Sequence, residues 1–166
     1  MNQNIPAFSR SSLLHMAIAI GAVVLTSGLG QIGTTRSLGN WYPALVKPGF
    51  TPPNLAFPIA WTALFALMAY AFWRILETRP ESPARTQAIR LFLAQLVLNA
   101  TWSWAFFGFQ NPKAGLAVIL VLEVAILFTL RGFWRIDRPA GWCLVPYAAW
   151  VAFATLLNAS IVWLNP

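Results

Sequence analysis

The sequence WYPALVKPGFTPPNLAFPIAW, from Trp41 to Trp61, is a proline-rich, basic and aromatic loop that leads directly into a long apolar stretch. Prolines restrict the backbone of this loop, because each proline ring fixes φ near about −65°. A simple connector between two membrane helices does not need so many residues that restrict its backbone conformation. We therefore expect an ordered loop that acts as a lid over another part of the molecule.

The composition of the 166-residue chain is typical of a membrane protein. Hydrophobic residues make up 58% of the chain and charged residues 9%, whereas soluble domains carry about 25% charged residues. So few charges cannot cover a water-facing surface, and the lipid bilayer is the expected solvent. The net charge of +7 does not predict nucleic-acid binding, because the basic residues lie in connectors between apolar runs.

A membrane-spanning helix needs about 20 mostly apolar residues, and five segments meet this requirement. We interpret the first as an uncleaved span, since it is longer than the ~7–15-residue core of a signal peptide. The sequence shows no strand alternation, linker or internal repeat, so we predict one all-α domain over residues 1–166, an integral membrane bundle. The predicted spans are 12–33, 54–76, 89–109, 113–134 and 139–164, with the lid loop at 34–53.

Proline and threonine predict where the helices begin and bend. Thr51 is suited to cap the second helix, with Pro52 and Pro53 in its first turn, where a missing N–H group costs nothing. Pro58 and Pro146 fall inside predicted spans and should kink or loosen them.

Basic residues are distributed unequally between the two ends of the predicted bundle. One end holds eight of the 11 basic residues: Arg10, Arg74, Arg79, Arg85, Arg90, Arg131, Arg135 and Arg138. The other end holds Arg36, Lys47 and Lys113. The positive-inside rule then places the N-terminus inside, and the lid loop and the C-terminus outside.

Two polar features lie within the spans. Gln95, Asn99 and Ser103 follow one another at intervals of four residues and share one helix face. Such a stripe faces either a cavity or a neighbouring helix, where it makes interhelical hydrogen bonds. Glu123 lies near the middle of the span 113–134, where a charged carboxylate costs roughly 2.5–3.5 kcal/mol, so it is a candidate for proton-coupled transport.

The sequence contains no conventional catalytic or metal-binding set. His15 is the only histidine and Cys143 the only cysteine, and they lie in separate spans. A Ser/His/Asp triad, paired catalytic carboxylates and a phosphate-binding glycine loop are all missing. We therefore predict no metal site.

Tryptophans concentrate in the half of the predicted bundle nearest the lid loop. Trp61, Trp102 and Trp104 lie toward that end of their spans, and Trp150 lies near mid-membrane. They predict a pocket for a flat apolar ligand, whose carboxylates Lys47 in the loop could meet. The alternative for each ring is packing against lipid or neighbouring side chains.

Two helix faces extend this predicted pocket. Trp61 and Phe65 share one face of the second span. Trp150, Ala154 and Asn158 share a face of the fifth span, where Ala154 leaves space between a ring and an amide.

Several of these residues form recognisable motifs. The first-loop residues are Trp41-Tyr42, Leu45, Lys47-Pro48, Pro52-Pro53, Phe57 and Trp61. Later segments are Gln95-Leu96 with Asn99, Trp102 and Phe106-Phe107-Gly108, then Asp137 and Ala140, then Pro146-Tyr147, Trp150, Phe153-Ala154 and Leu157-Asn158. Together they resemble the TspO/MBR family, also called tryptophan-rich sensory protein, translocator protein or peripheral-type benzodiazepine receptor.

The resemblance implies a five-helix membrane bundle that is commonly a homodimer. It implies no obligatory cofactor, and ligands that include protoporphyrin IX and haem, sterols in some members, and isoquinoline-carboxamide compounds. The family's sterol motif needs a basic residue after Tyr147, which this chain lacks. The family's pocket residues carry over to Tyr42, Pro52, Trp61, Phe65, Asn99, Trp102, Trp150 and Ala154, to which the residue pattern adds Lys47 and Asn158.

Three functions remain open from the sequence. We expect first a porphyrin-binding receptor or transporter-like protein that senses or regulates tetrapyrrole levels. The resemblance to some bacterial members allows an enzyme instead, one that degrades porphyrin with light and oxygen through Trp61 and Trp150. A proton-coupled transporter that uses Glu123 is the third.

Overall fold

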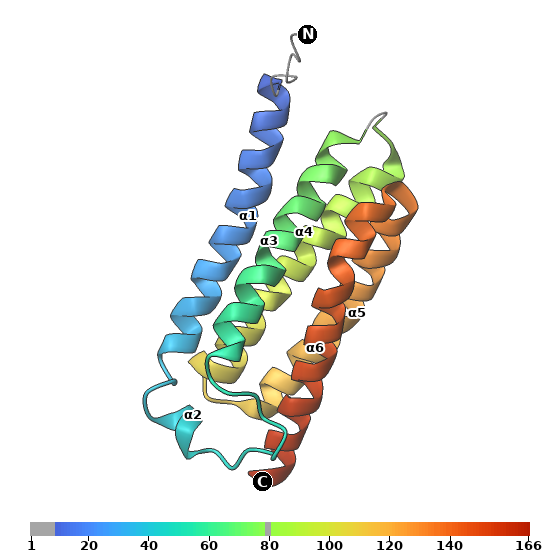
Figure 1. The fold of residues 1–166 in the computed structure, drawn as a ribbon. Coiled ribbons are helices and arrows are strands. Elements are labelled where there is room, and N and C mark those ends of the chain that lie inside the picture. Colours follow the sequence, from blue (N-terminus) through green and yellow to red (C-terminus); the bar gives the residue numbers. More distant parts are fainter. Residues whose placement is uncertain (1–8, 79–80) are drawn as a thin grey trace.

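The computed structural model describes residues 9–78 and 81–166. Arg79, which the sequence assigns to the inner end, lies outside the described residues. Five long helices run side by side (Figure 1): α1 (Arg10–Thr35), α3 (Ala56–Glu77), α4 (Pro83–Ser103), α5 (Pro112–Ile136) and α6 (Arg138–Leu164). A short helix, α2 (Trp41–Ala44), lies in the first loop, and a π-helical turn, Trp104–Gly108, continues α4.

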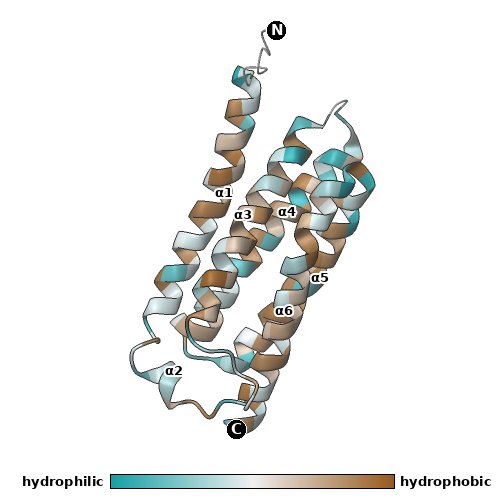
Figure 2. Cartoon of the chain, in the orientation of Figure 1, coloured by the Kyte–Doolittle hydropathy of each residue, from teal (hydrophilic) through white to brown (hydrophobic). Residues whose placement is uncertain are grey.

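The surface of this bundle suits a bilayer. Within the described residues, five helices are long and apolar enough to cross a membrane. Large apolar side chains such as Leu25, Ile59 and Val97 are exposed on their outer faces, and the sides of the bundle are largely hydrophobic (Figure 2). The predicted all-α, five-helix membrane bundle is confirmed.

The helices pack as a closed ring. α1 packs against α3 and α4, α5 packs between α4 and α6, and α6 completes the ring against α3. Three stacked rings fill the core between α3, α4 and α5: Phe72 lies 4.4 Å from Phe92, which lies 5.5 Å from Phe133. The first loop and the C-terminus lie at one end, and α1 begins at the other (Figure 1).

The start of α4 differs from the prediction. The helix begins at Pro83 rather than near Ile89. The hydroxyl of Ser82 accepts a hydrogen bond from the Arg85 amide at 3.2 Å, which caps the helix, and Pro83 occupies its first turn. Because the first turns are polar, a search for apolar runs places the start of this helix too late.

The predicted cap of α3 was wrong. Thr51 does not cap the helix; its hydroxyl donates to the Pro48 carbonyl at 2.7 Å, and the helix begins at Ala56. Residues that precede a proline disfavour helical geometry, which keeps the chain extended as far as Pro53. Pro58 consequently lies in the first turn and makes no interior kink, whereas Pro146 does lie inside α6.

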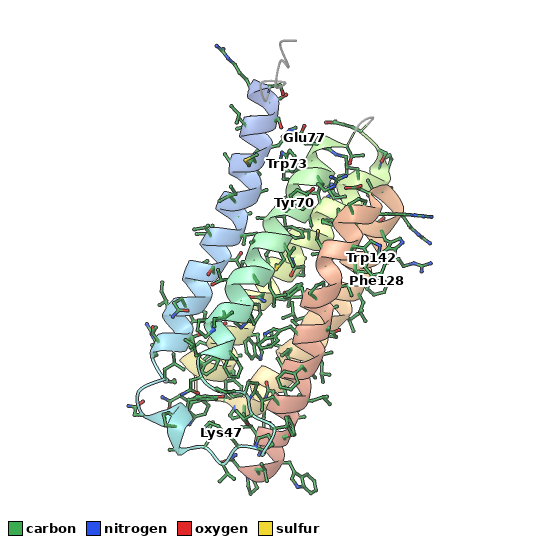
Figure 3. The ribbon with its side chains drawn as sticks, viewed as in Figure 1. Lys47, Tyr70, Trp73, Glu77, Phe128 and Trp142 are labelled. Carbon is green, nitrogen blue, oxygen red and sulfur yellow. The ribbon has the colours of Figure 1, made fainter. Side chains whose placement is uncertain are left out.

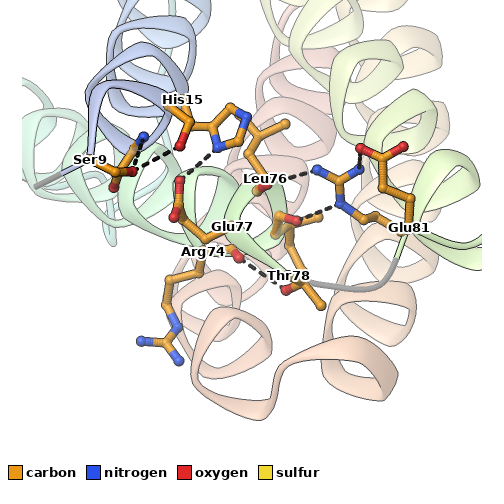
Figure 4. Close-up of polar contacts among 11 residues, drawn as sticks. Ser9, His15, Arg74, Leu76, Glu77, Thr78 and Glu81 are labelled. Atoms are coloured by element: carbon orange, nitrogen blue, oxygen red, sulfur yellow. Dashed lines mark hydrogen bonds and ion pairs between the residues drawn. The ribbon is translucent and has the colours of Figure 1, made fainter.

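Polar contacts tie the helices together at the end opposite the lid (Figure 4). His15 Nδ1 lies 2.6 Å from a carboxylate oxygen of Glu77, which joins α1 to α3. Arg85 is buried and donates to the Ile75 and Leu76 carbonyls at 2.9 and 2.7 Å. These carbonyls belong to the last turn of α3, where cations are favourable, so one arginine fixes the α3–α4 connection.

Replacing Arg85 with methionine should lower the free energy of unfolding by about 2–3 kcal/mol, because hydrogen bonds from charged groups contribute roughly 1.5–3 kcal/mol. Unfolding of the purified protein in detergent, followed by circular dichroism, measures the change. Arg90→Met is the matched control, since Arg90 is exposed on the same helix. Equal stability of the two variants would contradict the assigned role of Arg85.

Candidate functional site

The lid loop is anchored near its start and in its middle. The Ser37 hydroxyl donates to the Phe107 carbonyl, which connects the end of α1 to the π-helical turn. The Asn165 side chain makes two hydrogen bonds to Val46, one in each direction, both of 3.0 Å. The predicted ordered lid is therefore held by groups from both α4 and the C-terminal end of α6.

Aromatic rings fasten the lid to the bundle. Trp41 lies 5.7 Å from Phe106, and Tyr42 lies 5.3 Å from Phe107, measured between ring centroids. Burial raises the pKa of the Tyr42 phenol, so this side chain stays protonated at neutral pH. Both phenylalanines belong to the π-helical turn, a rare geometry that is often found at functional sites.

A second group of rings faces the interior of the ring of helices. Trp61 of α3 lies 5.3 Å from Phe65 and 6.3 Å from Tyr147 of α6. Phe57 lies 6.0 Å from Trp150, so α3 and α6 meet through aromatic contacts. Trp102 of α4 has its ring contacts with Phe106 and Phe107, both at 6.0 Å, and packs against the same buried core as Trp61 and Trp150. We call the following set the aromatic cluster: Phe57, Trp61, Phe65, Trp102, Tyr147 and Trp150.

A polar network runs beside the aromatic cluster. The Tyr147 hydroxyl donates to the Gln95 side-chain carbonyl at 2.9 Å and accepts from the Asn99 amide at 3.0 Å. Trp102 donates to Asn158 at 3.3 Å, and Asn158 donates to the Pro112 carbonyl at 2.9 Å. The two predicted pocket amides, Asn99 and Asn158, are therefore buried and join helices. For Asn99 this is the interhelical alternative that the sequence left open.

The remaining members of the predicted site lie near the lid. Lys47 Nζ donates to the Leu45 carbonyl at 3.1 Å and lies 4.7 Å from the centre of the Tyr42 ring. Lys47 lies at the lid end of the molecule (Figure 3). Pro52 is half-buried in the loop, and Ala154 packs against the core from α6.

Two residues singled out from the sequence lie elsewhere. Trp104 faces α1, where its indole donates to the Leu29 carbonyl at 2.9 Å and Arg36 stacks on its ring at 4.6 Å. It does not join the aromatic cluster. Glu123 is half-buried, and its Oε2 atom has no hydrogen-bond partner within residues 9–78 and 81–166.

Two contributors to this site are not apparent from the sequence. Asn165 lies outside every predicted span, and its contact with Val46 joins residues 119 positions apart, a pairing that no local pattern reveals. Tyr147 appeared only within a motif, although it is 1% exposed and bonds to two amides. An intramembrane tyrosine needs a hydrogen-bond partner, and that need was the available signal.

The chain is similar to one known protein family over most of its length. Residues 17–164 match the model of the TspO/MBR family. Tryptophan-rich protein TspO of Chlorobaculum tepidum is 40% identical over 154 residues, which cover 93% of this chain and 98% of that protein. The tryptophan-rich sensory protein of Cereibacter sphaeroides is 37% identical, with 82% and 85% covered, and the translocator protein of Bos taurus 31%, with 84% and 85% covered.

Replacing Asn165 with alanine should loosen the lid, because Val46 loses both hydrogen bonds to the C-terminal end. Hydrogen exchange of the Val46 amide should accelerate by about 5- to 10-fold, as expected for a bond worth roughly 1 kcal/mol. Asn54→Ala is the control, since Asn54 is exposed in the same loop. An unchanged Val46 exchange rate would show that Asn165 does not hold the lid.

Proposed function

We propose that this chain, which belongs to the TspO/MBR family, binds porphyrins such as protoporphyrin IX and haem in the aromatic cluster beneath the lid. As an integral, multi-pass membrane protein, it would sense or regulate tetrapyrrole levels from within the bilayer. The observation that carries this proposal is the convergence of rings from α3, α4 and α6 under an anchored loop.

The chemistry of the cluster suits a flat, apolar and anionic ligand. Aromatic faces stack on an extended π system, and such contacts are worth about 0.5–1.5 kcal/mol each beyond the area that they bury. Lys47 supplies a cation beside Tyr42, held by backbone carbonyls at 3.1 and 3.3 Å. A ligand carboxylate is a stronger acceptor than these carbonyls, so it would displace them.

Binding also requires movement of the lid or of the rings. Trp61 and Phe57 already contact rings on α6 at centroid distances of 6.3 and 6.0 Å. A flat ligand must replace such ring-to-ring contacts. Opening of the lid would break the hydrogen bonds of Ser37 and Asn165 and the ring contacts of Tyr42.

Titration of the purified protein with protoporphyrin IX in the dark, followed by tryptophan fluorescence, should give saturable quenching. Trp61→Phe should raise the Kd by about 2- to 12-fold, because a smaller ring loses part of its stacking energy. Tyr42→Ala should weaken binding further, since it also loosens the lid. Trp163→Phe is the control, because Trp163 is 85% exposed near the end of α6.

Two outcomes of this titration would contradict the proposal. The first is the absence of saturable quenching by the native protein. The second is a Kd that is the same in Trp61→Phe, Tyr42→Ala and Trp163→Phe.

Light-dependent porphyrin degradation is the alternative for the same site. Trp61 and Trp150 both lie in the aromatic cluster, so either indole would contact a ligand bound there. Repeating the titration under light and oxygen separates the two functions: an enzyme destroys the porphyrin absorbance in light and not in the dark. Full turnover by Trp61→Phe together with Trp150→Phe would exclude these residues from the reaction.

A proton-coupled transporter is the remaining candidate, and Glu123 motivates it. The Glu123 carboxyl is half-buried within α5, and one of its oxygens lacks a hydrogen-bond partner among the described residues. Proton relays use several titratable groups, which is why we rank this function third. If the protein is a proton-coupled transporter, liposomes that contain it should take up substrate, and Glu123→Gln should abolish this uptake.

Other expectations belong to the same proposal. Isoquinoline-carboxamides would occupy the aromatic cluster, and a homodimer is the expected assembly. Sterol binding stays a weaker expectation, because no basic residue follows Tyr147. The expected orientation places the N-terminus inside and the lid outside.

A further inference from the structure

A basic and aromatic surface lies at the turn between α5 and α6, at the end of the bundle opposite the lid. Phe128 and Trp142 project from this edge (Figure 3), and the rings of Trp134 and Trp142 lie 4.7 Å apart. We call this surface the α5–α6 patch: Phe128, Arg131, Trp134, Arg135, Arg138 and Trp142.

The arginines of the α5–α6 patch are exposed and have no acidic partner in the part of the chain that the structure describes. The described acidic residues at this end are engaged elsewhere. Asp137 binds Arg74 through two hydrogen bonds of 2.5 and 3.1 Å, Glu77 contacts His15, and Glu81 contacts Arg85. The patch therefore carries three positive charges that the described protein does not neutralise.

The basic residues at the lid end are used differently. Arg36 stacks on the Trp104 ring, and Lys47 is bonded to two loop carbonyls. These contacts satisfy the two cations within the protein. Lys113, the third basic residue at the lid end, is exposed and has no acidic partner among the described residues, but it is a single cation. The α5–α6 patch differs because it combines three such cations with exposed aromatic rings.

The depth of the side chains suits the boundary between acyl chains and headgroups. Phe128 is 59% and Trp142 61% exposed, and tryptophan is enriched at this boundary. Arg131 lies five residues before the end of α5, on the order of 8 Å at 1.5 Å per residue. A long arginine side chain extends from that depth to the surface while its stem stays among apolar groups.

The start of α6 adds a second attraction for anions. Asp137 precedes this helix, but its side chain makes no capping hydrogen bond, because its carboxylate binds Arg74. Pro139 has no N–H group and Ala140 is buried, so in the first turn of α6 the amide left uncapped at an exposed residue is that of Arg138. The positive end of a helix dipole favours a phosphate in such a place.

We propose that the α5–α6 patch binds an anionic phospholipid, with the phosphate between the three arginines and an acyl chain along Phe128 and Trp142. Basic clusters beside membrane helices recognise anionic headgroups, each cation contributing near the surface. The mixture of free cations and exposed apolar rings fits a lipid better than a soluble phosphate, which needs no apolar surface. The inference does not depend on porphyrin binding.

The test uses the full chain reconstituted in phosphatidylcholine vesicles, with part of the lipid replaced by brominated phosphatidylglycerol or brominated phosphatidylcholine. Bromine quenches nearby tryptophan, so fluorescence reports which lipid lies against Trp142. Phosphatidylglycerol should be preferred by at least about twofold, and the preference should fall as salt is raised. In Trp142→Phe the lipid-specific part of the quenching should disappear.

Matched variants test whether the preference for phosphatidylglycerol depends on the α5–α6 patch. Arg131→Gln, Arg135→Gln and Arg138→Gln combined should abolish the preference, while Arg36→Gln with Lys113→Gln should leave it intact. If circular dichroism shows that the triple variant misfolds, the three single substitutions are tested instead. Each of them should reduce the preference for phosphatidylglycerol. Equal quenching by the two brominated lipids would assign the patch to another occupant, such as an acidic protein segment, and would overturn the proposal. So would a preference that survives the arginine substitutions.

Discussion

The hydroxyl of Tyr147 is placed where hydrocarbon offers no hydrogen bonds, and the arrangement of α4 and α6 follows from that constraint. It donates to Gln95 and accepts from Asn99, so one atom bonds two side-chain amides of the facing helix, while the Gln95 Nε2 group has no hydrogen-bond partner among the described residues. Such bonds contribute only about 0.6–2 kcal/mol within membranes, and packing supplies more of the stability. Their larger effect is on register, because a rotation of either helix would bury unpaired polar groups.

This fixed pair of helices explains why the aromatic cluster forms at that level. Tyr147 holds its ring against Trp61, and the next turn of α6 presents Trp150 to Phe57. The lid then closes the same end through contacts with the π-helical turn and with Asn165. The opposite end is stiffened by charged contacts instead, with Arg74 on Asp137 and Arg85 on the α3 carbonyls. The two ends are therefore held differently, by neutral hydrogen bonds and ring contacts at the lid end and by charged contacts at the other.

The sequence predicts the five spans well because apolar composition and helix length are local properties. It misplaces the start of α4 because Ser82 and Pro83, rather than apolar residues, begin that helix. Local sequence patterns do not predict the positions of Lys47, Trp104 and Asn165. Each of these side chains is placed by the path of a loop or by a partner distant in the sequence. Helix faces predicted Trp61, Phe65 and Trp150 of the aromatic cluster, whereas Phe57 and Tyr147 appeared only within motifs. The hydrogen bonds beside the cluster required the packed structure.

The geometry of the π-helical turn Trp104–Gly108 makes this segment sensitive to the insertion or deletion of a residue. Side chains diverge by about 100° per residue in an α-helix, but the wider turn lets Phe106 and Phe107 both contact Tyr42. A substitution in this turn changes the shape of one ring. Deletion of a single residue would restore the tighter helix and rotate the following ring away from the lid. At this turn an insertion or deletion, rather than an exchange of side chains, would decide which ring meets the loop.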